Sequence, residues 1–184
     1  FYSCISLESA DLPDGVEEIE NRAFAGARYM TSARIPQSVH SMGESVFSGC
    51  RSLERMDIPG SIKTVPADTL FACAALKELS IGSGIQTIGR RAFGGCTALE
   101  SVRIPDGVTE LDAMAFMGDG ELVSAFIPES VKIIGAEAFA RCGKLREISL
   151  PGGIEDIGAA AFSGCAALAE KDGFVMIGDV CCGY

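Results

Sequence analysis

The eight cysteines have the widest choice of chemistry in this 184-residue chain, because thiols can form disulfides, bind metals or act as nucleophiles. Their spacing narrows that choice. No two cysteines are separated by two residues, which is the spacing typical of zinc ligands and of redox-active pairs. Six of them lie 23 residues apart, or a multiple of 23, and form one column: Cys4, Cys50, Cys73, Cys96, Cys142 and Cys165.

This column predicts free thiols. Residues that recur in stacked repeats have parallel side chains on backbones about 4.8 Å apart. A disulfide needs Cβ atoms that face each other at about 3.8 Å, so parallel stacking is poor disulfide geometry. We therefore expect reduced, buried thiols that pack as small apolar groups. Cys181 and Cys182 lie outside the column, and their spacing leaves exposure or covalent pairing open.

Other catalytic groups are scarce. The single histidine, His40, occupies a position that is polar in the other repeats, which indicates an exposed surface residue. The chain contains no Gly-x-Ser-x-Gly motif, no phosphate-binding glycine loop and no paired-carboxylate motif. We therefore predict a protein that is not an enzyme, with no catalytic residues, no cofactor and no metal site.

The charge of the chain limits its partners. A net charge of −10 argues against nucleic acid and anionic membranes, since a phosphate surface requires a basic stripe. No apolar run approaches the 18 or so residues that cross a bilayer, so we expect no membrane insertion. The first 21 residues carry six acids, but the spacing of Asp11, Asp14 and Glu17 matches no calcium loop. This acidic end is either a solvated face or a contact for a basic partner or for calcium.

A repeat of 23 residues organises the elements that must position these groups. Its prolines, with one glycine in their place, are Pro13, Pro36, Pro59, Gly82, Pro105, Pro128 and Pro151. A second column contains Phe1, Phe24, Phe47, Leu70, Phe93, Phe116, Phe139 and Phe162. A fixed period of this length is typical of a solenoid that stacks one supersecondary unit on the next.

Each unit can be interpreted physically. The alternating segment that ends at proline predicts a short strand, because proline cannot donate to a β-ladder. These strands are expected at residues 9–11, 32–34, 55–57, 78–80, 101–103, 124–126 and 147–149. The Val-x-x-Ile-Gly step is expected to turn the chain, with Gly43, Gly89, Gly135 and Gly158 available for a positive φ. Ala-Phe-x-Gly-Cys predicts one helical or 3₁₀ turn whose Phe enters the core.

Residues 127–145 and 150–168 share the pattern Ile/Leu-Pro-x-x-Val/Ile-x-x-Ile-Gly-x-x-Ala-Phe-x-x-Cys-x-x-Leu, which resembles the BspA-like, or Treponema pallidum type, leucine-rich repeat. The resemblance covers residues 1 to about 168. It implies an α/β repeat solenoid, a right-handed leucine-rich-repeat stack of about seven and a half coils with a parallel β-sheet on one wall and short helical or 3₁₀ turns opposite. The family is found on bacterial surface and secreted proteins and in some protists, where it mediates adhesion to host proteins or other cells. Its motif contains no catalytic residues.

The outward positions of the predicted strands are the candidate binding surface, because they are free to vary. One row contains Ser9, Ser32, Arg55, Glu78, Ser101, Ser124 and Glu147, and the other contains Asp11, Arg34, Asp57, Ser80, Arg103, Phe126 and Ser149. This wall is either a solvated sheet face or a protein-binding surface. For the second case we select Arg34, Arg55, Asp57, Arg103 and Phe126, since arginine and aromatic residues dominate interface hot spots. Neither row contains the Trp or Tyr that would favour a carbohydrate cleft.

The two ends depart from the repeat. The chain begins at Phe1 in the middle of a coil and without a signal peptide, so we expect a fragment of a longer protein. After Leu168 the period fails, and residues 169–184 predict a β-hairpin with a two-residue turn at Gly178 and Asp179, or the start of a further segment.

Three classes of function remain. The resemblance favours a non-catalytic protein-binding module of a bacterial cell-surface or secreted protein, which places the chain outside the cell. A structural spacer that holds another domain away from the cell is the second. An intracellular regulatory scaffold is the third, and the unpaired cysteines favour it because reducing compartments keep thiols free.

Overall fold

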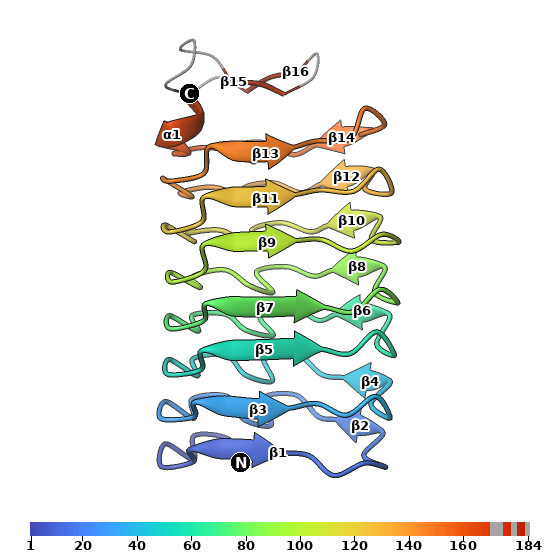
Figure 1. The fold of residues 1–184 in the computed structure, drawn as a ribbon, viewed down its shortest axis with the longest axis vertical. Coiled ribbons are helices and arrows are strands. Elements are labelled where there is room, and N and C mark those ends of the chain that lie inside the picture. The colour runs from blue at the N-terminus through green and yellow to red at the C-terminus, as the bar shows by residue number, and fades with distance from the viewer. Residues whose placement is uncertain (170–174, 178–179, 183–184) are drawn as a thin grey trace.

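The alternating segment of each repeat forms a short strand, and these strands stack in parallel along one side of the molecule (Figure 1). The computed structural model describes residues 1–169, 175–177 and 180–182. We call this side the strand wall. Its strands are β1 (Ser9–Asp11), β3 (Ser32–Arg34), β5 (Arg55–Ile58), β7 (Glu78–Ile81), β9 (Ser101–Arg103), β11 (Ser124–Phe126) and β13 (Glu147–Ser149). The predicted strand positions are thus confirmed, with β5 and β7 one residue longer than expected.

A second row of parallel strands forms where the sequence predicted only a turn. These two-residue strands are β2 (Glu18–Ile19), β4 (Ser41–Met42), β6 (Thr64–Val65), β8 (Thr87–Ile88), β10 (Glu110–Leu111), β12 (Ile133–Ile134) and β14 (Asp156–Ile157). They form a two-stranded sheet of β2 and β4, followed by a five-stranded sheet of β6, β8, β10, β12 and β14. The pairing is again offset by one repeat, as in Leu111 opposite Ile134. Two residues are too few to show an alternation of apolar and polar side chains. These strands could therefore not be predicted from the sequence, and only the stacked coils reveal them.

The expected helical or 3₁₀ turn around each Phe is not confirmed. Arg91 and Gly95, on either side of Phe93, have φ of 52° and 76°, and such left-handed residues cannot continue a right-handed helix. The Phe93 N–H instead donates to the carbonyl of Ala115 in the next coil at 2.9 Å. Among the described residues, the sole helix is α1 (Ala166–Ala169). The fold is therefore a parallel β-solenoid of the leucine-rich-repeat type, and its right-handed winding stays a prediction.

The glycines of the Val-x-x-Ile-Gly step serve a purpose other than the expected one. None of Gly43, Gly89, Gly135 and Gly158 has a φ in the left-handed region. A Cβ on Gly89 would lie 2.8 Å from the Val65 carbonyl oxygen, and one on Gly135 would lie 2.5 Å from the backbone nitrogen of Ala113. The glycines are required because the coils approach each other too closely here for a side chain.

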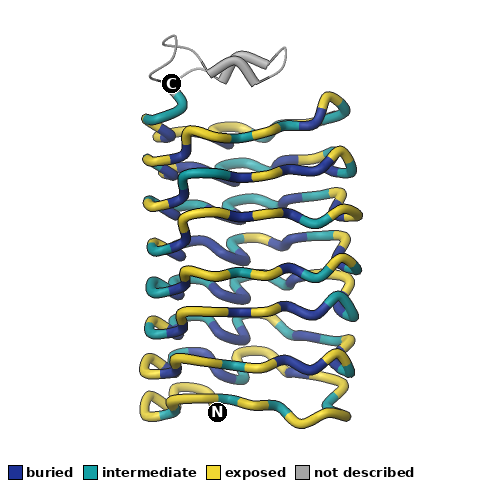
Figure 2. Tube along the Cα trace, viewed as in Figure 1, coloured by how far each residue is buried: buried dark blue, intermediate teal, exposed yellow. Residues whose placement is uncertain are grey.

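The core lies between the walls and is built from the repeated apolar columns (Figure 2). Phe47 and Phe139 are buried, as predicted. The ring of Phe139 stacks on its neighbours in both adjacent coils, with centroids 5.2 Å from Phe116 and 5.6 Å from Phe162. Burial of one such side chain contributes about 1.5–3 kcal/mol, and each aromatic pair about 0.5–1.5 kcal/mol more. Stability therefore comes from contacts between coils.

Beyond α1, β15 (Val175–Ile177) pairs antiparallel with β16 (Val180–Cys182). Ile177 lies opposite Val180, a register that matches a hairpin. The predicted turn at Gly178 and Asp179 lies outside the described residues, as do the side chains of Cys181 and Cys182. The boundary at residue 168 stays a prediction. No helix in the described part of the chain has the length and apolar character needed to cross a membrane.

Candidate functional site

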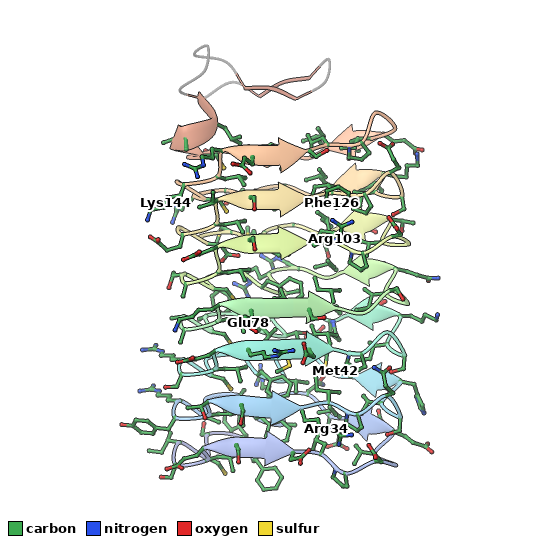
Figure 3. The ribbon with its side chains drawn as sticks, in the orientation of Figure 1. Arg34, Met42, Glu78, Arg103, Phe126 and Lys144 are labelled. Carbon is green, nitrogen blue, oxygen red and sulfur yellow. The ribbon has the colours of Figure 1, made fainter. Side chains whose placement is uncertain are left out.

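The strand wall presents two rows of outward side chains because alternate residues of each strand face opposite ways. In β9, for example, the central Val102 is buried, whereas Ser101 and Arg103 are exposed. The five residues that the sequence selected as partner-binding all lie in these rows. Figure 3 shows Arg34, Arg103 and Phe126 along the wall, with Arg103 next to Phe126 and Arg34 far from both.

Arg34 is neutralised by the acidic first coil. Its Nη2 lies 2.7 Å from a carboxylate oxygen of Asp14, and its Nη1 lies 3.5 Å from Asp11. Nη1 also donates to the Leu12 carbonyl at 3.0 Å. The hydrogen bond to Asp14 raises the pKa of Arg34 above its usual value. The guanidinium is thus occupied by groups of this chain.

Arg55 is also paired within the wall, and Asp57 is one of its partners. Arg55 donates from Nη1 to Glu78 at 3.1 Å, and its Nη2 lies 3.3 Å from Asp57. All three side chains are more than half exposed, so each pair contributes only about 0–1 kcal/mol to stability. The structure therefore brings together two of the predicted residues, but in an arrangement that satisfies both charges internally.

Arg103 and Phe126 form a different arrangement. They are register partners on β9 and β11, and the guanidinium carbon of Arg103 lies 4.2 Å from the centre of the Phe126 ring. This is a cation–π contact. Phe126 keeps 40% of its surface exposed beneath it. Among the described residues, no carboxylate lies within ion-pair distance of Arg103.

An open groove of about 460 Å³ runs over β9, β11 and β13 beside this pair. We call it the wall groove. Its outward lining residues are Ser101, Arg103, Ser124, Phe126, Glu147 and Ser149. The lining supplies serine hydroxyl groups, an arginine over an aromatic ring and a carboxylate. These groups can bind by hydrogen bonding, ion pairing and apolar contact.

Five of the six column thiols are buried in the stack. Cys50, Cys73, Cys96, Cys142 and Cys165 are free and buried, and Cys4 is free and exposed. Each buried thiol donates to a carbonyl 26 residues earlier, as Cys73 does to Phe47 at 3.2 Å. Burial raises the pKa of the Cys50 thiol to about 11 and raises the pKa of Cys73 and Cys96 well above the usual value. Thiolate, the reactive form, is therefore scarce at these three positions. The hydrogen bond between Cys142 and Cys165 instead lowers the pKa of Cys165.

Asp119 is a buried carboxyl group that was not among the residues selected from the sequence. It occupies the cysteine column between Cys96 and Cys142 and has no exposed surface. Its Oδ1 accepts a hydrogen bond from the Cys96 N–H at 2.8 Å, whereas Oδ2 has no partner. Burial raises the pKa of Asp119 well above its usual value. The break in the column was visible in the sequence and was the signal that could have revealed it.

His40 is exposed, as predicted, and its Nε2 lies 3.5 Å from Glu17. Within the described residues, no group of three or more His, Cys, Asp or Glu side chains is placed to hold a metal ion. Two acidic residues of the first coil, Asp11 and Asp14, instead pair with Arg34. The wall groove with Arg103 and Phe126 is the candidate site.

Comparison with known proteins agrees with this architecture. A leucine-rich repeat protein from Bacteroides ovatus superposes with a TM-score of 0.82 at 31% identity, covering 89% of this chain and 45% of its own. The T. pallidum leucine-rich repeat protein gives 0.82 at 30% identity, covering 87% of this chain and 77% of its own. One from Eubacterium ventriosum gives 0.76 at 25% identity, covering 86% and 43%. No curated protein matches the sequence significantly.

This chain thus spans less than half the length of two of these structures and about three quarters of the third. The family model for the BspA type leucine-rich repeat region matches residues 1–123 and 67–172 in six copies, against the seven and a half coils expected from the columns. These matches cover nearly the whole repeat region. The chain therefore belongs to the BspA type leucine-rich repeat family.

Proposed function

We propose that this chain is a non-catalytic module that binds a protein through its strand wall. The observation that carries the proposal is the Arg103–Phe126 pair, an exposed aromatic ring beneath an arginine that has no carboxylate partner among the described residues. Arginine and aromatic side chains supply most of the binding energy in protein interfaces.

We further propose that the module belongs to a bacterial cell-surface or secreted protein and adheres to host proteins or to other cells. Membership of the BspA type family supports this placement, because the family is found on such proteins. Free cysteines favoured an intracellular scaffold in the sequence. In the structure, however, burial keeps the thiols of Cys50, Cys73 and Cys96 protonated, so these cysteines would stay free in either compartment and favour neither one.

The test compares two double variants in an adhesion assay. The purified chain is coupled to fluorescent beads, and bead retention on cultured epithelial cells is counted under flow. Arg103→Ala with Phe126→Ser removes the pair from the strand wall. The matched control, Arg90→Ala with Ile133→Ser, removes an exposed arginine and an apolar residue of similar exposure, 36% against 40%, from outside the wall.

We expect the wall variant to weaken adhesion at least tenfold, which corresponds to about 1.4 kcal/mol, and the control to leave it unchanged. Circular dichroism should show the same fold and melting temperature for both variants, because neither removes a core residue. Equal adhesion by the wall variant and the wild-type chain would contradict the proposal. It would favour the structural spacer, which the internal pairing of Arg34 and Arg55 also supports.

A further inference from the structure

We infer that the wall groove recognises an acidic side chain next to an apolar one on the partner protein. Arg103 would bind the carboxylate, and Phe126 would contact the apolar neighbour. This inference rests on the proposed function and specifies the chemistry of the partner. Its evidence is the difference between Arg103 and the other arginines of the strand wall.

The first step is charge. The chain has 25 acidic and 15 basic residues, and the acids have already paired with the other wall arginines, Arg34 and Arg55. The outward neighbours of Arg103 on the adjacent strands, Ser80 and Phe126, are neutral. Asp57 and Glu78 line an adjoining hollow with Arg103, but both carboxylates are paired with Arg55. A positive charge therefore remains on a strongly acidic protein, and it complements an acid.

The second step is geometry. The guanidinium carbon of Arg103 lies 4.2 Å from the centre of the Phe126 ring, a distance that suits stacking of the guanidinium plane on the ring. The N–H donors of a stacked guanidinium lie in its plane, so they can bind a carboxylate through two parallel hydrogen bonds. The ring also limits the rotation of the arginine before binding. Less side-chain entropy is then lost when the carboxylate arrives.

The third step is the rest of the groove. Ser101 and Ser124 offer hydroxyl groups beside the arginine, where they can donate to a carboxylate or to a peptide carbonyl. Glu147 lines the groove on β13, and its carboxylate lies 3.7 Å from Nε of Arg146, so the charge at this end is already paired. Arg103 is the single cationic residue among those that line the groove. The groove therefore suits one acidic residue flanked by apolar or neutral ones, rather than a run of acids.

A protein partner fits these groups better than an acidic sugar. Sugars bind on the free faces of aromatic rings, whereas one face of Phe126 is covered by Arg103. The remaining exposed part of the ring suits a Leu-sized or Phe-sized side chain. Binding of a sialic acid or uronic acid glycan is consequently an outcome against the inference.

The experiment uses the 184-residue chain and an array of decapeptides that are acetylated and amidated at their ends. The central pair combines Asp, Glu, Asn, Gln or Lys with Leu, Phe or Ser, in neutral flanking sequences. Acid–apolar peptides should bind the wild-type chain at least ten times more tightly than their Asn or Gln counterparts. This preference should weaken with added salt, since it depends on charge. A parallel glycan array tests acidic sugars.

Four variants locate the preference. Arg103→Met should abolish it, and Arg103→Glu should reverse it in favour of Lys peptides. Phe126→Ser should remove the requirement for the apolar neighbour. Arg34→Met, which alters an internally paired arginine of the same wall far from Arg103, should leave the preference intact. Unchanged melting temperatures would show that all four variants fold.

The inference is overturned if the wild-type chain shows no preference for acids, if Arg103→Met or Arg103→Glu keeps the preference, or if acidic glycans bind through Arg103 in place of peptides. The proposed function has its own readout in the bead assay. Adhesion that depends on the wall, without a preference for acids, would leave the proposed function standing and remove this inference. A preference for acids without adhesion that depends on the wall would do the reverse.

Discussion

The replacement Asp119→Cys should stabilise the protein. Position 119 belongs to the cysteine column, and among the described residues it is the one buried position of that column that holds a carboxyl group. The replacement restores cysteine there. By analogy with Cys142, whose thiol donates to the Phe116 carbonyl at 3.2 Å, the new thiol should donate to the carbonyl of Phe93. The Cys96 N–H would lose Asp119, but it keeps the Phe93 carbonyl at 3.3 Å. No buried polar atom is then left without a partner at this position.

The magnitude follows from the orphaned oxygen. Oδ2 of Asp119 is buried without a hydrogen bond, and such a group costs about 1–3 kcal/mol. We expect Asp119→Cys to raise the free energy of unfolding by at least this amount at pH 7. The measurement is urea denaturation followed by circular dichroism, since the chain has no tryptophan for fluorescence.

The pH dependence provides a sharper test. The pKa of Asp119 is higher in the folded protein than in the unfolded chain, so its contribution to stability is full below the unfolded pKa of about 4 and is lost as pH rises toward the folded pKa. Between these two values, the advantage of Asp119→Cys over the wild type should grow by about 1.4 kcal/mol per pH unit. Taking the difference between the two proteins removes the titration of all other acids.

Two controls accompany this experiment. Asp119→Asn keeps the shape of the side chain and removes its titration. This variant should therefore lose the pH-dependent destabilisation and keep the cost of the unpaired buried atom. Asp106→Asn removes an exposed acid just after β9, and its free energy of unfolding should follow that of the wild type. A Cys variant that is less stable than the wild type at pH 7, or an advantage independent of pH, would refute the assignment of Asp119 as a destabilising buried carboxyl.

Three further predictions concern the stack. Phe139→Ala should cost about 3–5 kcal/mol in a denaturation experiment, because it empties a fully buried site between two stacked rings, and hydrogen exchange should locate the loss in the neighbouring coils. Cys96→Ala should cost about 1–2 kcal/mol and leave binding intact, and mass spectrometry after alkylation under denaturing, non-reducing conditions should find every column thiol free; a Cys73–Cys96 link would contradict this. Gly135→Ala should lower the melting temperature because its Cβ would lie 2.5 Å from the backbone of the preceding coil, whereas Gly152→Ala, which meets nothing within 4 Å, should not; equal melting temperatures would argue against close coil packing.

Much of the fold could be predicted because the repeat is uninterrupted. Pro36 and its equivalents mark the ends of the strands, since proline cannot donate to a ladder, and the Phe column marks the core. The spacing of 23 residues also determines which residues are neighbours across the strand wall. It therefore predicted that Arg103 and Phe126 would lie side by side, as the register of β9 and β11 confirms.

Other features depend on contacts between coils, which a single repeat does not contain. Gly135 was expected to supply a positive φ, but the distance to the preceding coil makes glycine necessary there. The left-handed conformation of Arg91 is unexpected for its residue type, and it accompanies the hydrogen bond from its N–H to the Ala113 carbonyl of the next coil at 3.0 Å. Residue preferences describe one coil at a time, so they favoured a helical turn that the stacking does not form.

The candidate site divides in the same way. The sequence by itself determined which side chains point outward from the strand wall, because the period of a strand is two residues. Only the tertiary structure decided which of the selected arginines are free. Arg34 reaches Asp14, which belongs to a loop outside its own row, and Arg55 reaches an acid of the next coil, whereas Arg103 finds an aromatic ring. The partner of a long side chain depends on distances in space, and those distances are fixed only when the coils stack.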